Sequence, residues 1–364
     1  MRDPDLAVAA GRKLVVGGAG FVGSNLVRRL LDDDAARVVV VDNFLSSERS
    51  QVPNDPRVEL IEGSIADEAV LAALPRVDQV YHLATFHGNQ NSIEDPIADH
   101  DNNLITTLKL FERLRTMTGL ERVVYAASGC SLAEKTDDAP APTDEFGAVP
   151  IEHDSPYQIS KIVGEFYAVY YHRRHGLPTV RARFQNVYGP GEILGAGIWR
   201  GTDATVWRNV TPTFIYRALA GLPLRLDNGG TASRDFIFVE DIVEGLLRCA
   251  SFGAPGRVYN LASGVETSIA QLADHIARLS NSTSEIVVEP RRDWDTAGRR
   301  FGSTDRAESE IGFRARVALD EGLARTVAWT QENWPEIARC IARHADRMAA
   351  PVPLSAVSHS ATAQ

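Results

Sequence analysis

The sequence has few cysteines and no long apolar or basic run. Its three cysteines, Cys130, Cys249 and Cys340, are widely spaced and form no CxxC pair or zinc-like cluster, which argues against disulfides and a structural metal. No apolar run reaches the ~18–20 residues of a membrane span, and the first residues lack a signal-peptide core. We therefore expect a cytoplasmic protein without a membrane partner. The net charge of −10, without a basic run, argues against a nucleic-acid partner.

Short β-branched runs alternate with helical patterns in the first half of the chain. This alternation predicts βαβ units, and hence an α/β fold with a Rossmann-type, doubly wound parallel sheet. The expected strands are 13–18, 37–42, 58–63, 79–84 and 122–128, which are bounded by Gly, Asp or Ser, and a sixth at 179–184. The expected helices include 97–116 and 156–175. After Phe184 a Gly-rich stretch indicates a long loop, followed by helical patterns at 212–220, 239–250 and 268–279 and a strand at 257–262.

A glycine-rich turn follows the first strand. Gly17, Gly20 and Gly23 have the spacing GxxGxxG and open a helix, where backbone N–H groups can approach a pyrophosphate. Asp42 ends the second strand, where a carboxylate can accept hydrogen bonds from an adenosine ribose and would repel a 2′-phosphate. The pattern favours NAD over NADP, although glycines alone are equally compatible with a plain strand-to-helix turn.

A second motif combines a tyrosine and a lysine with a serine. Tyr157 and Lys161, in SPYQISK, share one helix face, and Ser128 ends the strand 122–128. A nearby ammonium favours the phenolate, which can take a proton from a sugar hydroxyl while the same carbon is oxidised by NAD. YxxxK alone occurs by chance, and the serine at the strand end is what strengthens the catalytic interpretation.

Taken together, the motifs resemble the extended short-chain dehydrogenase/reductase family, and within it the nucleotide-sugar epimerases and dehydratases. The likeness covers about residues 12–345, through GGAGFVGSNL, VDNF, YHLAT, SIEDP, DNNLITTL, SPYQISK, RFQNVYGPGE and RDFIFVEDIVEG. It implies a homodimeric, NAD-dependent enzyme acting on a nucleotide-diphosphate sugar, with Ser128, Tyr157 and Lys161 as its catalytic triad. The cofactor residues that it implies are Gly17, Gly20, Phe21, Val22, Gly23, Asp42, Asn43, Ser64, Ile65, Leu83, Ala84, Asn103, Tyr157 and Lys161.

The same resemblance suggests substrate residues and a division of the chain. The expected substrate residues are His87, Asn186, Arg208, Asn209 and Arg234, with a surface ion pair to Asp235 as the alternative for Arg234 and a structural role as the alternative for His87. We expect a Rossmann domain at 12–185, to which 235–263 returns. A smaller mixed α/β nucleotide-sugar lobe would comprise 186–234 and 264–345, followed by a disordered tail at 349–364.

Three segments depart from the family pattern. Ser64 stands where an acidic residue is common, and Leu132-Ala133 replaces a Tyr-Gly pair. The stretch 197–210 has no clear counterpart; it is expected either to border the sugar and diphosphate, with Arg200 among the candidates, or to be an exposed loop.

The residues after Ser128 bear on the reaction. Related 4,6-dehydratases and uronate decarboxylases carry a carboxylate there, whereas this chain has Gly129 and Cys130. A 4-epimerase needs no further acid or base, because the sugar is oxidised at C4, turns over, and is reduced on its opposite face. We therefore expect an NAD-dependent nucleotide-sugar 4-epimerase, with a UDP-sugar as the commonest substrate of such enzymes.

Cys130 leaves an alternative open. GDP-mannose 3,5-epimerases carry a cysteine at this place, which exchanges protons beside a C4 ketone. They also use a lysine on the loop after YGP, and this loop offers only Arg200 and Arg208. For Cys130 itself, the other interpretation is inert packing. For the whole protein, the remaining interpretations are an NDP-sugar dehydratase or decarboxylase, a keto-sugar reductase, and a nonredox binding protein.

Overall fold

Seven parallel strands form the central sheet of the computed structural model, which describes residues 11–32, 36–129, 138–198, 206–207, 209–292 and 298–347. The strand order is β10-β6-β5-β4-β1-β2-β3. The strands are β1 (Gly11–Val16), β2 (Ala36–Asp42), β3 (Val58–Glu62), β4 (Gln79–His82), β5 (Arg122–Ser128), β6 (Thr179–Phe184) and β10 (Val258–Leu261). The predicted Rossmann-type sheet is thereby confirmed. The order reverses between β1 and β4, and this is the point where ligands bind in open α/β sheets.

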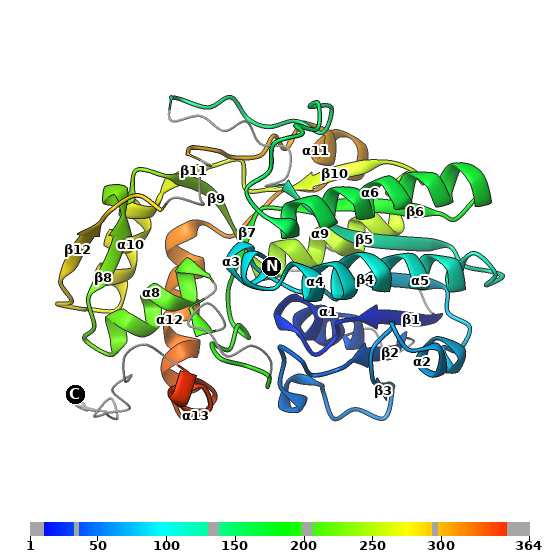
Figure 1. The fold of residues 1–364 in the computed structure, drawn as a ribbon, viewed down its shortest axis with the longest axis horizontal. Helices are drawn as coiled ribbons and strands as arrows, with labels where there is room; N and C mark the ends of the chain where they lie inside the picture. The colour runs from blue at the N-terminus through cyan, green and yellow to red at the C-terminus, as the bar shows by residue number, and fades with distance from the viewer. Residues whose placement is uncertain are drawn as a thin grey trace.

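Helices cover both faces of this sheet (Figure 1). On one face lie α1 (Phe21–Leu31), α9 (Val239–Ser251) and α11 (Asp305–Ile311). The other face carries α2 (Glu68–Ala73), α5 (Thr106–Leu114) and α6 (Pro156–His175). Because successive strand residues point to opposite faces, β1, β2, β4 and β5 contribute to both apolar cores.

Helix α6 has the boundaries that the sequence predicted. Ser155 caps it by accepting a hydrogen bond from the backbone N–H of Gln158, and Pro156 occupies its first turn. Gly176 ends it with φ of 69°, a left-handed conformation that glycine adopts without strain.

The predicted helix 97–116 is present, with a π-helical segment inside it. After α3 (Asn89–Glu94) and α4 (Pro96–Asp99), a π-helical segment, η2 (His100–Ile105), precedes α5. The wider turn lies where Asn103 is buried, and the Asn103 side chain donates to Asp99 (2.8 Å) and to the backbone oxygen of Phe86 (3.2 Å). Periodicity alone could not show this local widening, because it leaves the apolar positions of α5 on one face.

The smaller lobe lies to the left of the large sheet in Figure 1. One sheet has the order β11-β9-β7, and a second pairs β12 with β8. The strands are β7 (Asn186–Tyr188), β8 (Leu224–Asp227), β9 (Ser233–Phe238), β11 (Glu266–Ser268) and β12 (Ile286–Glu289). The helices are α8 (Val210–Leu219), α10 (Ile269–Leu279), α12 (Leu319–Glu332) and α13 (Trp334–Ala342), and short turns lie at η4 (Asn228–Gly230) and η5 (Ala345–Arg347). A further short turn, η1 (Arg49–Gln51), lies between β2 and β3 of the large sheet.

The two-lobe division remains our proposal. Helix α9 packs against β5 and β6, and β10 joins the large sheet, which supports a return of the chain to the first lobe. Strand β9 instead pairs with β7 and β11. The predicted tail at 349–364 lies outside the described residues. Among the helices that the structure describes, none has the length and apolar character needed to cross a bilayer.

Candidate active site

A cavity of about 970 Å³ lies between the carboxyl edge of the large sheet and the smaller lobe. It brings together all but one of the described residues that the sequence singled out. Those that line it are Gly17, Gly20, Phe21, Val22, Gly23, Asp42, Asn43, Ser64, Ile65, Leu83, Ala84, His87, Ser128, Tyr157, Lys161, Asn186, Asn209 and Arg234. Asn103 is the exception: it lies behind the wall, where its Oδ1 accepts from the backbone N–H of Phe86 (2.7 Å).

The glycine-rich turn forms one end of the cavity. Gly17 has φ of +82°, and a Cβ there would lie 2.6 Å from the backbone nitrogen of Ala84. A Cβ on Gly23 would lie 2.1 Å from the carbonyl oxygen of Gly17. Gly20 caps α1 without a side-chain hydrogen bond, which leaves the helix N-terminus to face an anion. This cradle fits the pyrophosphate of a dinucleotide.

Asp42 lies beside the glycine turn and is nearly buried. Its carboxylate accepts hydrogen bonds from the backbone N–H groups of Ala19 and Phe44 and from the hydroxyl of Ser47, each at 2.9 Å. Burial raises the pKa of Asp42, and these three hydrogen bonds oppose that shift. The side chain is thus fixed at the end of β2, where a ribose of a bound dinucleotide would meet an acceptor.

Ser128, Tyr157 and Lys161 all line the cavity. Ser128 ends β5, while Tyr157 and Lys161 project from the first turns of α6. Lys161 Nζ donates to the backbone oxygen of Ala126 (3.1 Å) and lies 5.8 Å from the centre of the Tyr157 ring. Burial lowers the pKa of Lys161 to about 8, and the charge of Asp99 opposes that fall. The ammonium is therefore held against the tyrosine that it would activate.

A buried polar cluster supports this pair from behind. Asn103 Nδ2 lies 2.8 Å from Asp99 and 3.3 Å from the Ser160 hydroxyl. Ser160 also donates to the backbone oxygen of Tyr157 (3.1 Å). Burial raises the pKa of Asp99, and its hydrogen bonds to Ser160 and Asn103 oppose the shift. The cluster ties the π-helical segment to the helix that carries Tyr157 and Lys161.

Arginines gather at the opposite end of the cavity. Sequence analysis named Arg234 there, and the structure adds Arg217, Arg225, Arg291, Arg292 and Arg300. Arg300 is buried, and its Nε has no hydrogen-bond partner among the described residues. Planar, permanently charged guanidinium groups suit a diphosphate. These residues lack a common motif, because they come from a helix, a strand and loops that only folding brings together.

The alternative to a substrate role for Arg234 was a surface ion pair with Asp235, and the structure does not show this pair. Arg234 is buried, lines the cavity, and donates to the backbone oxygens of Ser233 (2.7 Å) and Gly298 (2.8 Å). Asp235 accepts instead from Ser263 and Gly264, because neighbouring strand residues point to opposite faces.

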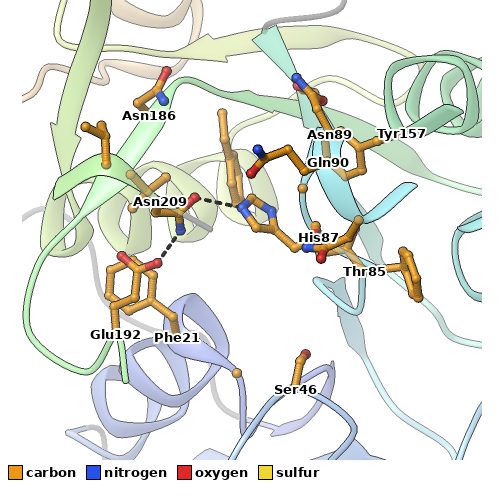
Figure 2. Close-up of a pocket in the computed structure, with 18 of the residues that line it drawn as sticks. Phe21, Ser46, Thr85, His87, Asn89, Gln90, Tyr157, Asn186, Glu192 and Asn209 are labelled. Carbon is orange, nitrogen blue, oxygen red and sulfur yellow. Dashed lines mark hydrogen bonds between the residues drawn. The ribbon is translucent and has the colours of Figure 1, made fainter. Parts of the chain in front are cut away.

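His87 and Asn209 both line the cavity and are hydrogen-bonded to each other (Figure 2). His87 Nε2 lies 2.9 Å from Asn209 Oδ1, and Asn209 Nδ2 donates to Glu192. Sequence analysis did not single out Glu192, although it closes the motif RFQNVYGPGE. The candidates Cys130, Arg200 and Arg208 lie outside the described residues, as does most of the 197–210 stretch.

Comparison with known proteins identifies the family. A profile of the NAD-dependent epimerase/dehydratase family matches residues 13–262. The chain belongs to the NAD-dependent epimerase/dehydratase family. It is 56% identical to the Bordetella bronchiseptica enzyme WbmF, whose structure with NAD+ and UDP matches with a TM-score of 0.84 over 94% of this chain and 98% of that one.

Two curated members of the family illustrate its chemistry. A UDP-glucose 4-epimerase of Mycolicibacterium smegmatis is 32% identical over 87% of this chain and 97% of its own length. A dTDP-glucose 4,6-dehydratase of Streptomyces antibioticus is 29% identical over 88% of this chain and 92% of its own. The family membership and the NAD dependence that the sequence predicted are confirmed.

Proposed function

We propose that this chain is an NAD-dependent nucleotide-sugar 4-epimerase that acts on a UDP-sugar. The observation that carries this proposal is that three groups of residues line one cavity. They are the glycine cradle, the set Ser128, Tyr157 and Lys161, and the arginines. A bound nucleotide sugar with its diphosphate among the arginines would place its sugar beside Tyr157. The UDP held by WbmF and the substrate of the mycobacterial relative support UDP as the nucleotide.

The residues of the cavity have distinct roles in this reaction. NAD, when bound at the glycine cradle, supplies the redox chemistry at the sugar carbon. Tyr157 takes the proton of the C4 hydroxyl and returns it, while Lys161 stabilises the phenolate by its charge. Ser128 hydrogen-bonds the same sugar oxygen and holds it in place. The arginines keep the diphosphate fixed while the keto sugar turns over.

The absence of a carboxylate at Gly129 and Cys130 favours epimerisation over dehydration. A Cβ on Gly129 would lie 2.2 Å from the side-chain nitrogen of Gln185. A carboxylate therefore fits at position 129 only if Gln185 moves. Dehydration needs an acid and a base beyond Tyr157, whereas C4 epimerisation does not.

A substrate panel tests this proposal. Purified enzyme without added cofactor is incubated with UDP-, dTDP-, GDP- and CDP-sugars, and products are identified by NMR. We expect a C4 epimer from a UDP-sugar and no deuterium on carbon in D₂O. Deuterium at C3 or C5 would instead support the chemistry suggested by Cys130, stoichiometric NADH consumption would indicate a reductase, and no turnover would reject the proposal.

We also propose a homodimer formed through the helices at about 97–116 and 156–175, which include α4 and α6. Ile97 on α4 and Ile159, Phe166 and Tyr170 on α6 are exposed apolar side chains, and the two helices pack side by side. The spacing of the three α6 residues puts them on one helix face. Light scattering should show a dimer that Phe166→Glu dissociates. The cytoplasmic location and the absence of nucleic-acid or membrane partners stay predictions, which cell fractionation tests.

A further inference from the structure

Three side chains form a hydrogen-bonded chain that leads from the smaller lobe to the catalytic tyrosine (Figure 2). Glu192 lies in the loop after β7, Asn209 precedes α8, and His87 lies between β4 and α3. The imidazole ring of His87 in turn contacts the Tyr157 ring edge-on, with ring centroids 5.8 Å apart and an interplanar angle of 76°. The chain thus connects a buried carboxylate to the place where the sugar would react.

The direction of each hydrogen bond follows from the donors and acceptors. Asn209 donates its amino group to Glu192, which is the direction that a carboxylate acceptor requires. The carbonyl oxygen of Asn209 then faces His87, and this oxygen can only accept. His87 Nε2 must therefore carry a hydrogen. A neutral imidazole has one N–H, so Nδ1 is then a hydrogen-bond acceptor.

We propose that Glu192, acting through Asn209, holds His87 in the Nε2-protonated tautomer, so that Nδ1 accepts a hydrogen bond from a sugar hydroxyl next to C4. The proposal rests on the proposed function, because it is the C4 hydroxyl at Tyr157 that brings the neighbouring hydroxyls to His87. His87 is then a specificity-determining residue for a hydroxyl donor, and Glu192 is a positioning residue.

Glu192→Gln distinguishes this role from simple packing. A glutamine amide has nearly the same shape as glutamate but donates as well as accepts. It allows Asn209 to turn over and offer its amino group to His87, whose Nε2 would then accept and whose Nδ1 would carry the hydrogen. Glu192→Asp is the matched control, because a shorter carboxylate still only accepts.

The tautomer can be read directly by two-bond ¹H–¹⁵N spectra of NAD-loaded protein labelled at its nine histidines. At pH about 8, above the ordinary pKa of histidine, we expect His87, assigned by its loss in His87→Gln, to carry its hydrogen on Nε2. The Glu192→Asp control keeps this pattern, and Glu192→Gln shifts it toward Nδ1–H. An Nδ1–H or cationic His87 in the native protein, or an unchanged tautomer in Glu192→Gln, would overturn the proposal.

UDP-glucose then serves as the probe of the sugar contact. Saturation should shift the native Nδ1 signal in the direction of an accepted hydrogen bond, and Glu192→Gln should lose this response. The loss of one hydrogen bond should lower kcat/KM about fivefold in Glu192→Gln. An unmoved Nδ1 signal in the presence of UDP-glucose would refute the sugar contact. If no nucleotide sugar turns over, the proposed function fails, while the tautomer spectra still decide on the relay.

Discussion

The two ends of the cavity are built in different ways. The proposed cofactor end is built around a glycine turn whose backbone lies close to neighbouring backbone, with Gly17 and Gly23 in positions that exclude a side chain. The substrate end consists of side chains, chiefly arginines, from segments far apart in the sequence. A backbone site depends on the absence of side chains, whereas a side-chain site depends on which charges folding brings together. The two ends should therefore respond differently to substitution.

The largest expected effect lies between the two ends, at Tyr157. Tyr157→Phe keeps the ring but removes the proton acceptor, and we expect kcat to fall about 10³- to 10⁴-fold. NAD should remain bound, because the glycine cradle is untouched. Quenched turnover assays and the NAD content of the purified variant measure both effects, and substantial remaining activity would contradict the catalytic assignment.

A substitution in the glycine turn at the cofactor end should abolish NAD binding. In Gly23→Ala the new Cβ would lie 2.1 Å from the carbonyl oxygen of Gly17, and backbone cannot move aside easily. We expect NAD to be lost from the purified protein and the free energy of unfolding to fall by about 1–3 kcal/mol.

A matched control for this prediction is Gly147→Ala. Nothing lies within 4 Å of a Cβ at Gly147, so NAD content and stability should stay near those of the native protein. Chemical denaturation and the absorbance of released NAD compare the two variants. Retention of NAD in Gly23→Ala would show that the turn tolerates a side chain.

A substitution at the substrate end should weaken substrate binding without abolishing it. Arg300→Gln removes one buried guanidinium from the cavity, and we expect KM for the nucleotide sugar to rise about 10- to 100-fold with a small change in kcat. Arg299→Gln is the neighbouring control, because Arg299 pairs with Glu266 instead of lining the cavity. Steady-state kinetics separate the two, and equal KM values would remove Arg300 from the site.

The smallest expected effect is a shift in pH dependence. Because burial lowers the pKa of Lys161 to about 8, the ammonium is present below that pH and is lost as the pH rises through it. Since the charged lysine favours the phenolate, kcat/KM should fall above about pH 8. Asp99→Asn removes the charge that raises the pKa of Lys161, so the fall should begin at lower pH.

A pH–rate profile of the native enzyme and Asp99→Asn measures this shift. NAD binding serves as the control, since Asp99 does not line the cavity. If kcat/KM falls at the same alkaline pH in both proteins, Asp99 supports the fold without influencing the pKa of Lys161.

Local sequence patterns determined the cofactor end, the Tyr157–Lys161 pair and the strands of the large sheet. Each of these depends on short-range rules: glycine where backbone approaches backbone, a spacing of four on a helix, and apolar runs in buried strands. Only the tertiary structure decided the rest. The π-helical segment at His100–Ile105, the cluster of arginines and the contact of Glu192 with His87 through Asn209 depend on segments that meet only in the folded chain. The physical reason is that a backbone cradle is specified by its own few residues, whereas a charged pocket is specified by the packing of distant ones.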